Sequence, residues 1–190
     1  NQTYQNFEVS VQNGGTSDNT LELLEKHYGN HPKVIFSSKP TKLGEGTNIA
    51  IQQGSGELIL QLDSDDILNP DALTELVKAI GETNVCAYAN FHRIKENGEY
   101  LDRGWEEAIY SRERLMRSMI VHHPRLFRRD AWKEVGGHDE YLRNAEDYDF
   151  FMKLSEVGNF VHLRKDLYAY RILEDSASNF DSELLTNNTH

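Results

Sequence analysis

Cysteine is almost absent from this chain of 190 residues, because Cys86 is the only one. A single cysteine excludes an intrachain disulfide, which fits a reducing compartment such as the cytosol. Cys86 lies in the apolar stretch Val85-Cys86-Ala87-Tyr88-Ala89. We therefore expect a buried core thiol rather than a reactive one.

Long apolar runs and an excess of basic residues are also lacking. No run approaches the roughly 20 apolar residues that span a bilayer, so we expect no transmembrane segment. The 20 lysines and arginines are outnumbered by 31 aspartates and glutamates, and the formal net charge is −11. This charge argues against nonspecific binding to nucleic acid or anionic lipid, which depends on clustered Lys and Arg. A phosphate-bearing substrate would need a local cation.

The start of the chain has neither an initiator methionine nor the basic-then-apolar layout of a signal peptide. We expect a fragment of a longer chain whose other domains are its partners. The expected location is the cytoplasm, or the cytoplasmic face of a membrane reached through regions or partners outside this chain.

Apolar periodicity predicts strands that alternate with helices in the first half. The expected strands cover residues 7–12, 34–36, 58–62 and 85–91, and the expected helices cover 18–28, 49–53 and 69–80. Such alternation predicts an α/β fold with a mostly parallel central sheet flanked by helices. Ligands of such sheets bind at the carboxyl ends of the strands.

The second half is less regular. Its pattern predicts helices over 111–119 and 145–157, and short strands at 126–127, 160–163 and 167–172. We expect one domain over residues 1–180 and a frayed polar tail over 181–190.

The strongest chemical signal is Asp63-Ser64-Asp65-Asp66, directly after the apolar strand at 58–62. Three carboxylates repel one another unless they are solvated or bound to a cation, and Mg²⁺ or Mn²⁺ takes oxygen ligands of this kind. The alternative is an exposed turn that caps the next helix. A calcium-binding EF-hand loop is less favoured still, because its sixth and twelfth positions would hold Leu68 and Thr74.

A second acidic cluster, Glu146-Asp147-Tyr148-Asp149, opens the helix predicted at 145–157. The helix dipole favours acids in a first turn, which accounts for one or two of them without any catalytic role. Beside a metal-phosphate site, a carboxylate here could act as general base for an incoming hydroxyl, an effect of roughly 10²- to 10⁴-fold in rate.

The order of these motifs resembles that of family 2 glycosyltransferases with the GT-A fold. The motifs are Asn1-Gln2-Thr3-Tyr4, Asp18-Asn19-Thr20, Gln61-Leu62-Asp63-Ser64-Asp65-Asp66, Gly136-Gly137 and Glu146-Asp147. More narrowly, Met119-Ile120-Val121-His122-His123 and Lys153-Leu154-Ser155-Glu156-Val157-Gly158 resemble the glucuronic-acid-transferring domain of bacterial chondroitin, hyaluronan and heparosan polymerases.

The resemblance implies an inverting hexosyltransferase that moves a sugar from a UDP-sugar to a glycan or glycoconjugate. It implies that Mn²⁺ or Mg²⁺ is held by Asp63, Asp65 and Glu174, and that Asp147 is the catalytic base. The implied donor-binding residues are Asn13, Asp63, Asp65 and Asp66. The nucleotide-sugar half would cover about residues 1–95, and the acceptor half about 96–180.

The resemblance also implies acceptor contacts for His122, His123 and Glu146, although histidines with purely local hydrogen bonds remain the alternative. Arg125 could offset the diphosphate charge or form an ordinary surface ion pair. Trp105 and Trp132 could stack on sugar rings, and core packing is the better expectation for Trp132.

Three departures from the family pattern bear on activity. Gly14 stands where the family has an acid that reads the uracil, and Leu173 stands near the place of a usual metal-binding histidine, with Glu174 beside it. The family's first strand is expected to be lacking from this chain. A catalytically degenerate GT-A module that binds sugar or a partner domain is therefore the alternative function. A nucleotidyltransferase is less favoured, because no Gly-rich phosphate loop with Lys or Arg lies near the amino end.

Overall fold

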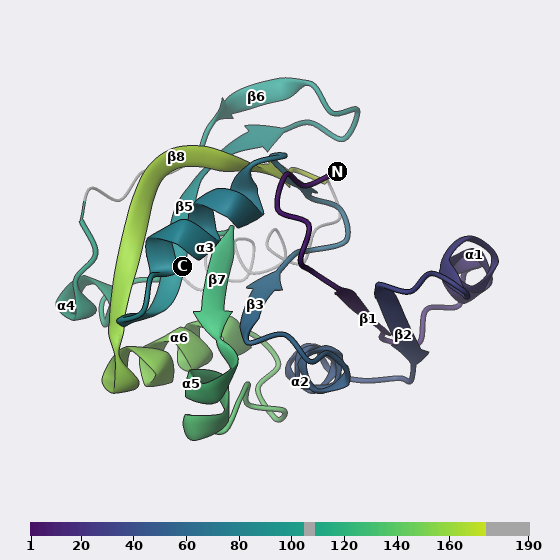
Figure 1. Ribbon diagram of the computed structural model, residues 1–190, viewed down its shortest axis with the longest axis horizontal. Coiled ribbons are helices and arrows are strands. Elements are labelled where there is room, and N and C mark those ends of the chain that lie inside the picture. The colour runs from purple at the N-terminus through teal and green to yellow at the C-terminus, as the bar shows by residue number, and fades with distance from the viewer. Residues whose placement is uncertain (105–108, 174–190) are drawn as a thin grey trace, which may run out of the picture.

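A computed structural model describes residues 1–104 and 109–173 of the chain. Its main body is a six-stranded mixed sheet in the order β3-β7-β5-β8-β4, with β6 paired to β5. The strands of this sheet are β3 (Leu58–Gln61), β4 (Ile67–Leu68), β5 (Asn84–Ile94), β6 (Tyr100–Arg103), β7 (Arg125–Arg128) and β8 (Asn159–Arg171). Figure 1 shows β8 and β5 as long strands that run together.

The α/β class is confirmed, but the sheet is mixed where a mostly parallel sheet was expected. β7 lies between β3 and β5 and is antiparallel to both, while β5 and β8 are parallel. Periodicity reveals a strand but not its neighbours, so this insertion had no local signal. Because β7 is antiparallel to β3, the carboxyl end of β3 meets the amino end of β7. Gln61 and Arg125 are paired there.

A second, two-stranded sheet is formed by β1 (Val9–Asn13) and β2 (Val34–Ser38), which are parallel. Along the chain, α1 (Thr20–Tyr28) connects β1 to β2, and α2 (Leu43–Gln53) follows β2. Figure 1 shows β1, β2 and α1 to one side of the larger sheet. Within the described residues β1 pairs with β2 alone and β3 with β7 alone, and the expectation of a lacking first strand stays a prediction.

Two apolar clusters cover opposite faces of the large sheet, because side chains alternate along β5. Ala87 and Ala89 belong to the cluster of α3 (Ala72–Ile80). Cys86 and Tyr88 belong to the cluster under α4 (Arg112–Leu115), α5 (Arg129–Glu134) and α6 (Glu146–Val157). The expected core positions of Cys86 and Trp132 are confirmed.

Several boundaries differ from the sequence expectations. The helix predicted over 111–119 is only the single turn α4, and the two strands predicted at 160–163 and 167–172 are one strand, β8. β8 is continuous because it pairs with β5 along most of its length, despite the charged segment at its middle. No helix among the described residues is both long and apolar enough to cross a membrane.

Candidate active site

The first acidic cluster forms the loop that leaves the carboxyl end of β3. Asp66 is tied to β8: Tyr168 Oη donates to its Oδ2 at 2.7 Å, and the Arg171 backbone N–H donates to its Oδ1 at 2.7 Å. The Arg171 guanidinium in turn donates from Nε to the carbonyl of Asp65 at 2.7 Å. Both oxygens of Asp66 are therefore occupied by the protein, which assigns this acid to holding the loop.

Burial raises the pKa of Asp66 to about 6, with the charges of Asp65 and Asp63 adding to the rise and the bonds from Arg171 and Tyr168 opposing it. Asp63 differs, since 54% of its side chain is exposed. The side chains of Asp63 and Asp65 make no such bonds to β8, and a donor-binding role for Asp66 stays a prediction.

The second acidic cluster lies at the start of α6. Asp147 accepts from Arg125 Nη1 at its Oδ2, at 2.9 Å, and from the Tyr148 backbone N–H at its Oδ1, at 2.7 Å. Partial burial would raise the pKa of Asp147, but the charge and hydrogen bond of Arg125 outweigh it, and the pKa is lowered. Asp147 is therefore held ionised.

Arg125 joins the two acidic clusters. It is the first residue of β7, its side chain is only 5% exposed, and its other terminal nitrogen contacts His123 Nε2 at 2.9 Å. His123 stacks on Tyr168 with 5.3 Å between ring centroids, and its Nδ1 lies 3.9 Å from Asp63 Oδ2. A continuous chain of contacts thus runs from Asp63 through His123 and Arg125 to Asp147. Of the two alternatives for Arg125, the ordinary surface ion pair is wrong, because the guanidinium that pairs with Asp147 is buried.

The remaining histidine and glutamate proposed for the acceptor have different surroundings. The His122 ring lies 5.6 Å from the Phe91 ring, and Glu146 is 7% exposed. Burial raises the pKa of Glu146. Of the three residues, His123 lies between the two acidic clusters, in contact with Arg125 and near Asp63. An acceptor role for any of them stays a prediction.

Asn13 ends β1 and is 6% exposed. Its Oδ1 accepts hydrogen bonds from Gly15 N, Thr16 N and Thr16 Oγ1 at 3.1 to 3.2 Å. The side-chain carbonyl of Asn13 therefore organises the turn that follows β1. A donor-binding role for Asn13 would have to use its amide nitrogen.

The described residues include only some of the metal ligands expected from the sequence. Glu174 and Trp105 lie outside the described residues. Within the described part of the chain no group of three or more His, Cys, Asp or Glu side chains is arranged to hold a metal. Asp63 and Asp65 still fit Mg²⁺ or Mn²⁺, because these ions use one or two carboxylates and complete their shell with water and substrate phosphates.

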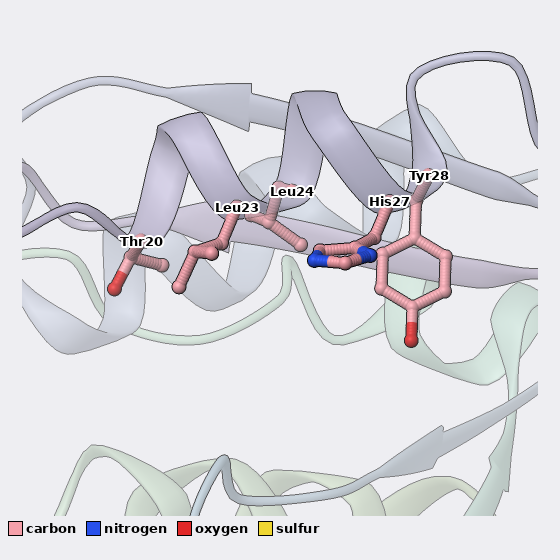
Figure 2. Close-up of a pocket in the computed structure, with 5 residues that line it drawn as sticks. All are labelled: Thr20, Leu23, Leu24, His27 and Tyr28. Atoms are coloured by element: carbon pink, nitrogen blue, oxygen red, sulfur yellow. The ribbon is translucent and has the colours of Figure 1, made fainter.

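A hollow of about 450 Å³ lies on α1 and is lined by none of the residues described above. Figure 2 shows its five lining side chains, all carried by that one helix. They include Leu23, Leu24 and His27 but no carboxylate. This hollow has none of the acids that the chemistry above requires, so size does not identify the site.

Residues 1–136 match the model of glycosyl transferase family 2, which covers more than half of the chain. The chain belongs to glycosyl transferase family 2. It is 40% identical over 188 residues to the chondroitin synthase of Pasteurella multocida (strain Pm70), covering 96% of this chain and 20% of that protein. It is 41% identical over 181 residues to the hyaluronan synthase of Pasteurella multocida, covering 94% and 19%.

This glycosyltransferase chain thus spans about a fifth of the length of these curated relatives. Among solved structures it is similar to S. aureus TarS in complex with UDP, with a TM-score of 0.74 and 25% identity over 90% of this chain and 53% of that one. These matches confirm the GT-A fold, and with it the family resemblance noted in the sequence.

Three residues of this site were not assigned from sequence, or were assigned differently. The sequence suggests phosphate or surface pairing for Arg125, and it gives no sign of the contacts that Tyr168 and Arg171 make with Asp66 and Asp65. Tyr168 and Arg171 lie about 100 positions after Asp66, and only the pairing of β4 with β8 brings them beside it. The sequence pattern of a strand carries no signal for such a contact.

Proposed function

We propose that this chain is an inverting glycosyltransferase domain that moves a sugar from a UDP-sugar to a glycan or glycoconjugate. The observation that supports this most is the meeting of the two acidic clusters through His123 and Arg125. A donor held at Asp63 and Asp65 and a base at Asp147 would then lie on opposite sides of one reaction centre.

In this proposal Asp147 accepts the proton of the acceptor hydroxyl as that oxygen attacks the anomeric carbon of the donor sugar. The bond from that carbon to the UDP oxygen breaks, UDP leaves with the bonding electrons, and the anomeric configuration inverts. Arg125 keeps Asp147 ionised before the reaction, so that the carboxylate is ready to take a proton.

Asp63 and Asp65 would hold Mn²⁺ or Mg²⁺, and the bound ion would supply positive charge to the diphosphate. Asp66 would act indirectly, by keeping the loop on β8. Because the chain carries a net charge of −11, a dianionic diphosphate would otherwise meet a repulsive surface at this loop.

The donor sugar we propose is glucuronic acid, and the parent protein would act in polysaccharide synthesis. This rests on the resemblance to the glucuronic-acid-transferring domain of the polymerases and on the similarity to the two Pasteurella synthases. We propose that residues 1–180 form the catalytic domain, with further domains in the parent chain. The reaction would take place in the cytoplasm, where Cys86 stays reduced.

Calorimetric titration with a panel of UDP-sugars, with and without Mn²⁺, tests the donor site. We expect metal-dependent binding of UDP-glucuronic acid, and a loss of at least about tenfold in affinity for Asp65→Ala. Glu57→Ala is a matched control, since Glu57 is an exposed acid that precedes β3. No binding of any UDP-sugar in Mn²⁺ would contradict the proposal.

A noncatalytic GT-A module is the second candidate, and one observation favours it. The Asn13 carbonyl is committed to its turn and Gly14 has no side chain, so the usual uracil-reading acid has no replacement there. Asp147→Asn separates the two functions, because it removes the base but keeps the shape. Sugar transfer that is abolished in this variant, with donor affinity retained, would exclude the noncatalytic module.

A further inference from the structure

A second, polar hollow lies beside α6. It has a volume of about 300 Å³, which is at the lower end of the range for small-ligand sites. Its walls come from α2, from the loop that precedes α6, and from α6 itself. The lining residues used below are Asn48, His138, Asp139, Glu140, Tyr141 and Lys153.

Tyr141 is the most unusual residue of this hollow, because 85% of it is exposed. Its backbone is nevertheless held: Asp139 Oδ1 accepts from the Tyr141 N–H at 2.7 Å and from the Leu142 N–H at 3.3 Å. The Lys42 ammonium lies 5.6 Å from the centre of the Tyr141 ring. An ordered loop thus presents an uncovered aromatic ring to solvent, at a cost that burial under a ligand would offset.

The polar groups around Tyr141 can bind hydroxyl and carboxylate or amide groups. Glu140 accepts from Asn48 Nδ2 at its Oε1, at 3.1 Å, while its Oε2 makes no hydrogen bond with any described residue. Lys153 Nζ lies 2.9 Å from Asp149 Oδ2 and has further protons to donate. An aromatic ring flanked by a free carboxylate oxygen and an ammonium group suits a sugar ring, whose C–H face is apolar and whose edge is polar.

One wall of the hollow contacts both α6 and the end of β3, since His138 Nε2 lies 3.2 Å from Gln61 Nε2. His138, on its wall, is stacked on Phe150 of α6 with 4.2 Å between ring centroids, and α6 begins with Glu146 and Asp147. None of Asp63, Asp65 and Asp66 lines the hollow. A sugar bound there would lie against α6, the helix that carries Asp147, and would not contact the acids assigned to the diphosphate.

We infer that the hollow around Tyr141 binds a sugar ring of the acceptor glycan. The ring stacks on Tyr141, and its hydroxyl groups donate to Glu140. Lys153 donates to a carboxylate or N-acetyl oxygen of the glycan. The inference rests on the proposed transferase function, because that function supplies the acceptor and sets Asp147 as its base.

The test uses oligosaccharides of chondroitin and of hyaluronan as probes, with binding measured by NMR on the 190-residue chain without donor. Tyr141→Ala is expected to weaken binding about tenfold, whereas Tyr141→Phe keeps it within about twofold, because stacking and not the hydroxyl is at issue. Tyr100→Ala is the matched control, since Tyr100 is 60% exposed on β6. Its binding should equal that of the wild type.

Donor binding separates this inference from the function on which it rests. If UDP-glucuronic acid binds with Mn²⁺ and the oligosaccharides bind Tyr141→Ala as they bind the wild type, the inference is overturned and the function stands. If Tyr141→Ala weakens the donor instead, the hollow belongs to the donor sugar and the inference is also overturned. In transfer assays, Tyr141→Ala is expected to raise the KM for the oligosaccharide and to leave the KM for the donor unchanged, and this result would support the inference.

Discussion

At the scale of single residues, Arg125 determines the state of the site. It is a buried cation between a neutral histidine and a carboxylate, and burial together with the charge of Arg125 lowers the pKa of His123 well below its ordinary value. His123 therefore accepts a hydrogen bond from Arg125 rather than competing with it for Asp147. One guanidinium thus sets the ionisation of two neighbours, which a lysine with a single nitrogen cannot reproduce.

Replacement of Arg125 by Met should separate this role from simple packing. Asp147 would lose the hydrogen bond that holds its carboxylate in place, so kcat would fall by about 100-fold. Its pKa would rise, and unfolding would become easier by roughly 3 kcal/mol. Kinetic assays with a pH profile and chemical denaturation measure the two effects. Arg125→Lys should fall between the wild type and Arg125→Met. Full activity in Arg125→Met would contradict the assignment.

Tyr168 offers a second test at this scale, because its hydroxyl holds Asp66. Tyr168→Phe keeps the ring that stacks on His123 but leaves Asp66 Oδ2 without its donor. We expect unfolding to require about 1 to 2 kcal/mol less, and metal-dependent donor affinity to fall because the acidic loop is held less firmly. Urea denaturation and calorimetry measure both, with Tyr100→Phe as the exposed control. Equal stability and equal donor affinity of Tyr168→Phe and Tyr100→Phe would argue against a role of the Tyr168 hydroxyl in holding Asp66.

At the scale of elements, α2 is fitted against the loop that precedes α6. Gly44, near the start of α2, leaves no room for a side chain, since a Cβ there would overlap the carbonyl oxygen of Asp139. Asn48, one turn later, makes two hydrogen bonds to the backbone of His138. Its Nδ2 donates to the His138 carbonyl at 2.9 Å, and its Oδ1 accepts from the His138 N–H at 3.0 Å. These contacts set the position of the loop that carries Asp139, Glu140 and Tyr141.

Gly44→Ala should therefore destabilise the protein although alanine is the better helix former. The gain in helix propensity is at most about 1 kcal/mol, whereas forcing a methyl group against backbone costs roughly 1 to 3 kcal/mol. Gly14→Ala is the control, because its Cβ would meet nothing nearer than Thr41 Oγ1 at 3.8 Å. Thermal unfolding measures both, and a Gly44→Ala protein as stable as the wild type would contradict this fit.

At the scale of the whole molecule, stability should depend on pH through His138. This residue is 3% exposed, its Nδ1 has no hydrogen-bond partner among the described residues, and burial together with the charge of Arg125 lowers its pKa to about 4. In the unfolded chain its pKa is about 6.5. Between these values the unfolded state binds a proton that the folded state does not, so stability falls as the pH decreases.

The contribution of His138 is fully present above pH 6.5 and is lost progressively down to about pH 4. The loss amounts to about 1.4 kcal/mol per pH unit at most, or about 3 kcal/mol over the window. Denaturation at a series of pH values should show a slope in the wild type that is reduced in His138→Gln, whatever the stability of this variant at pH 7. An unchanged slope would contradict the assignment.

The sequence by itself determined the elements and the chemistry that lie close together along the chain. The runs at 58–62, 69–80 and 145–157 were predicted as the elements β3, α3 and α6, because the first is a short continuous apolar run and the other two have apolar residues at helical spacing. The order of the acidic motifs was enough to indicate the family. The local apolar pattern was enough to predict an element wherever the burial of its apolar residues decided its structure.

Only the tertiary structure decided how those pieces meet. The antiparallel insertion of β7 brings Arg125 opposite Gln61, and the pairing of β8 brings Tyr168 and Arg171 to Asp66. These contacts join residues 64 to 105 positions apart, and the choice of partner depends on packing of the whole sheet rather than on any local period. For that reason the sequence named Asp63, Asp65 and Asp147 as candidates, while the folded chain alone determined which side chains surround them.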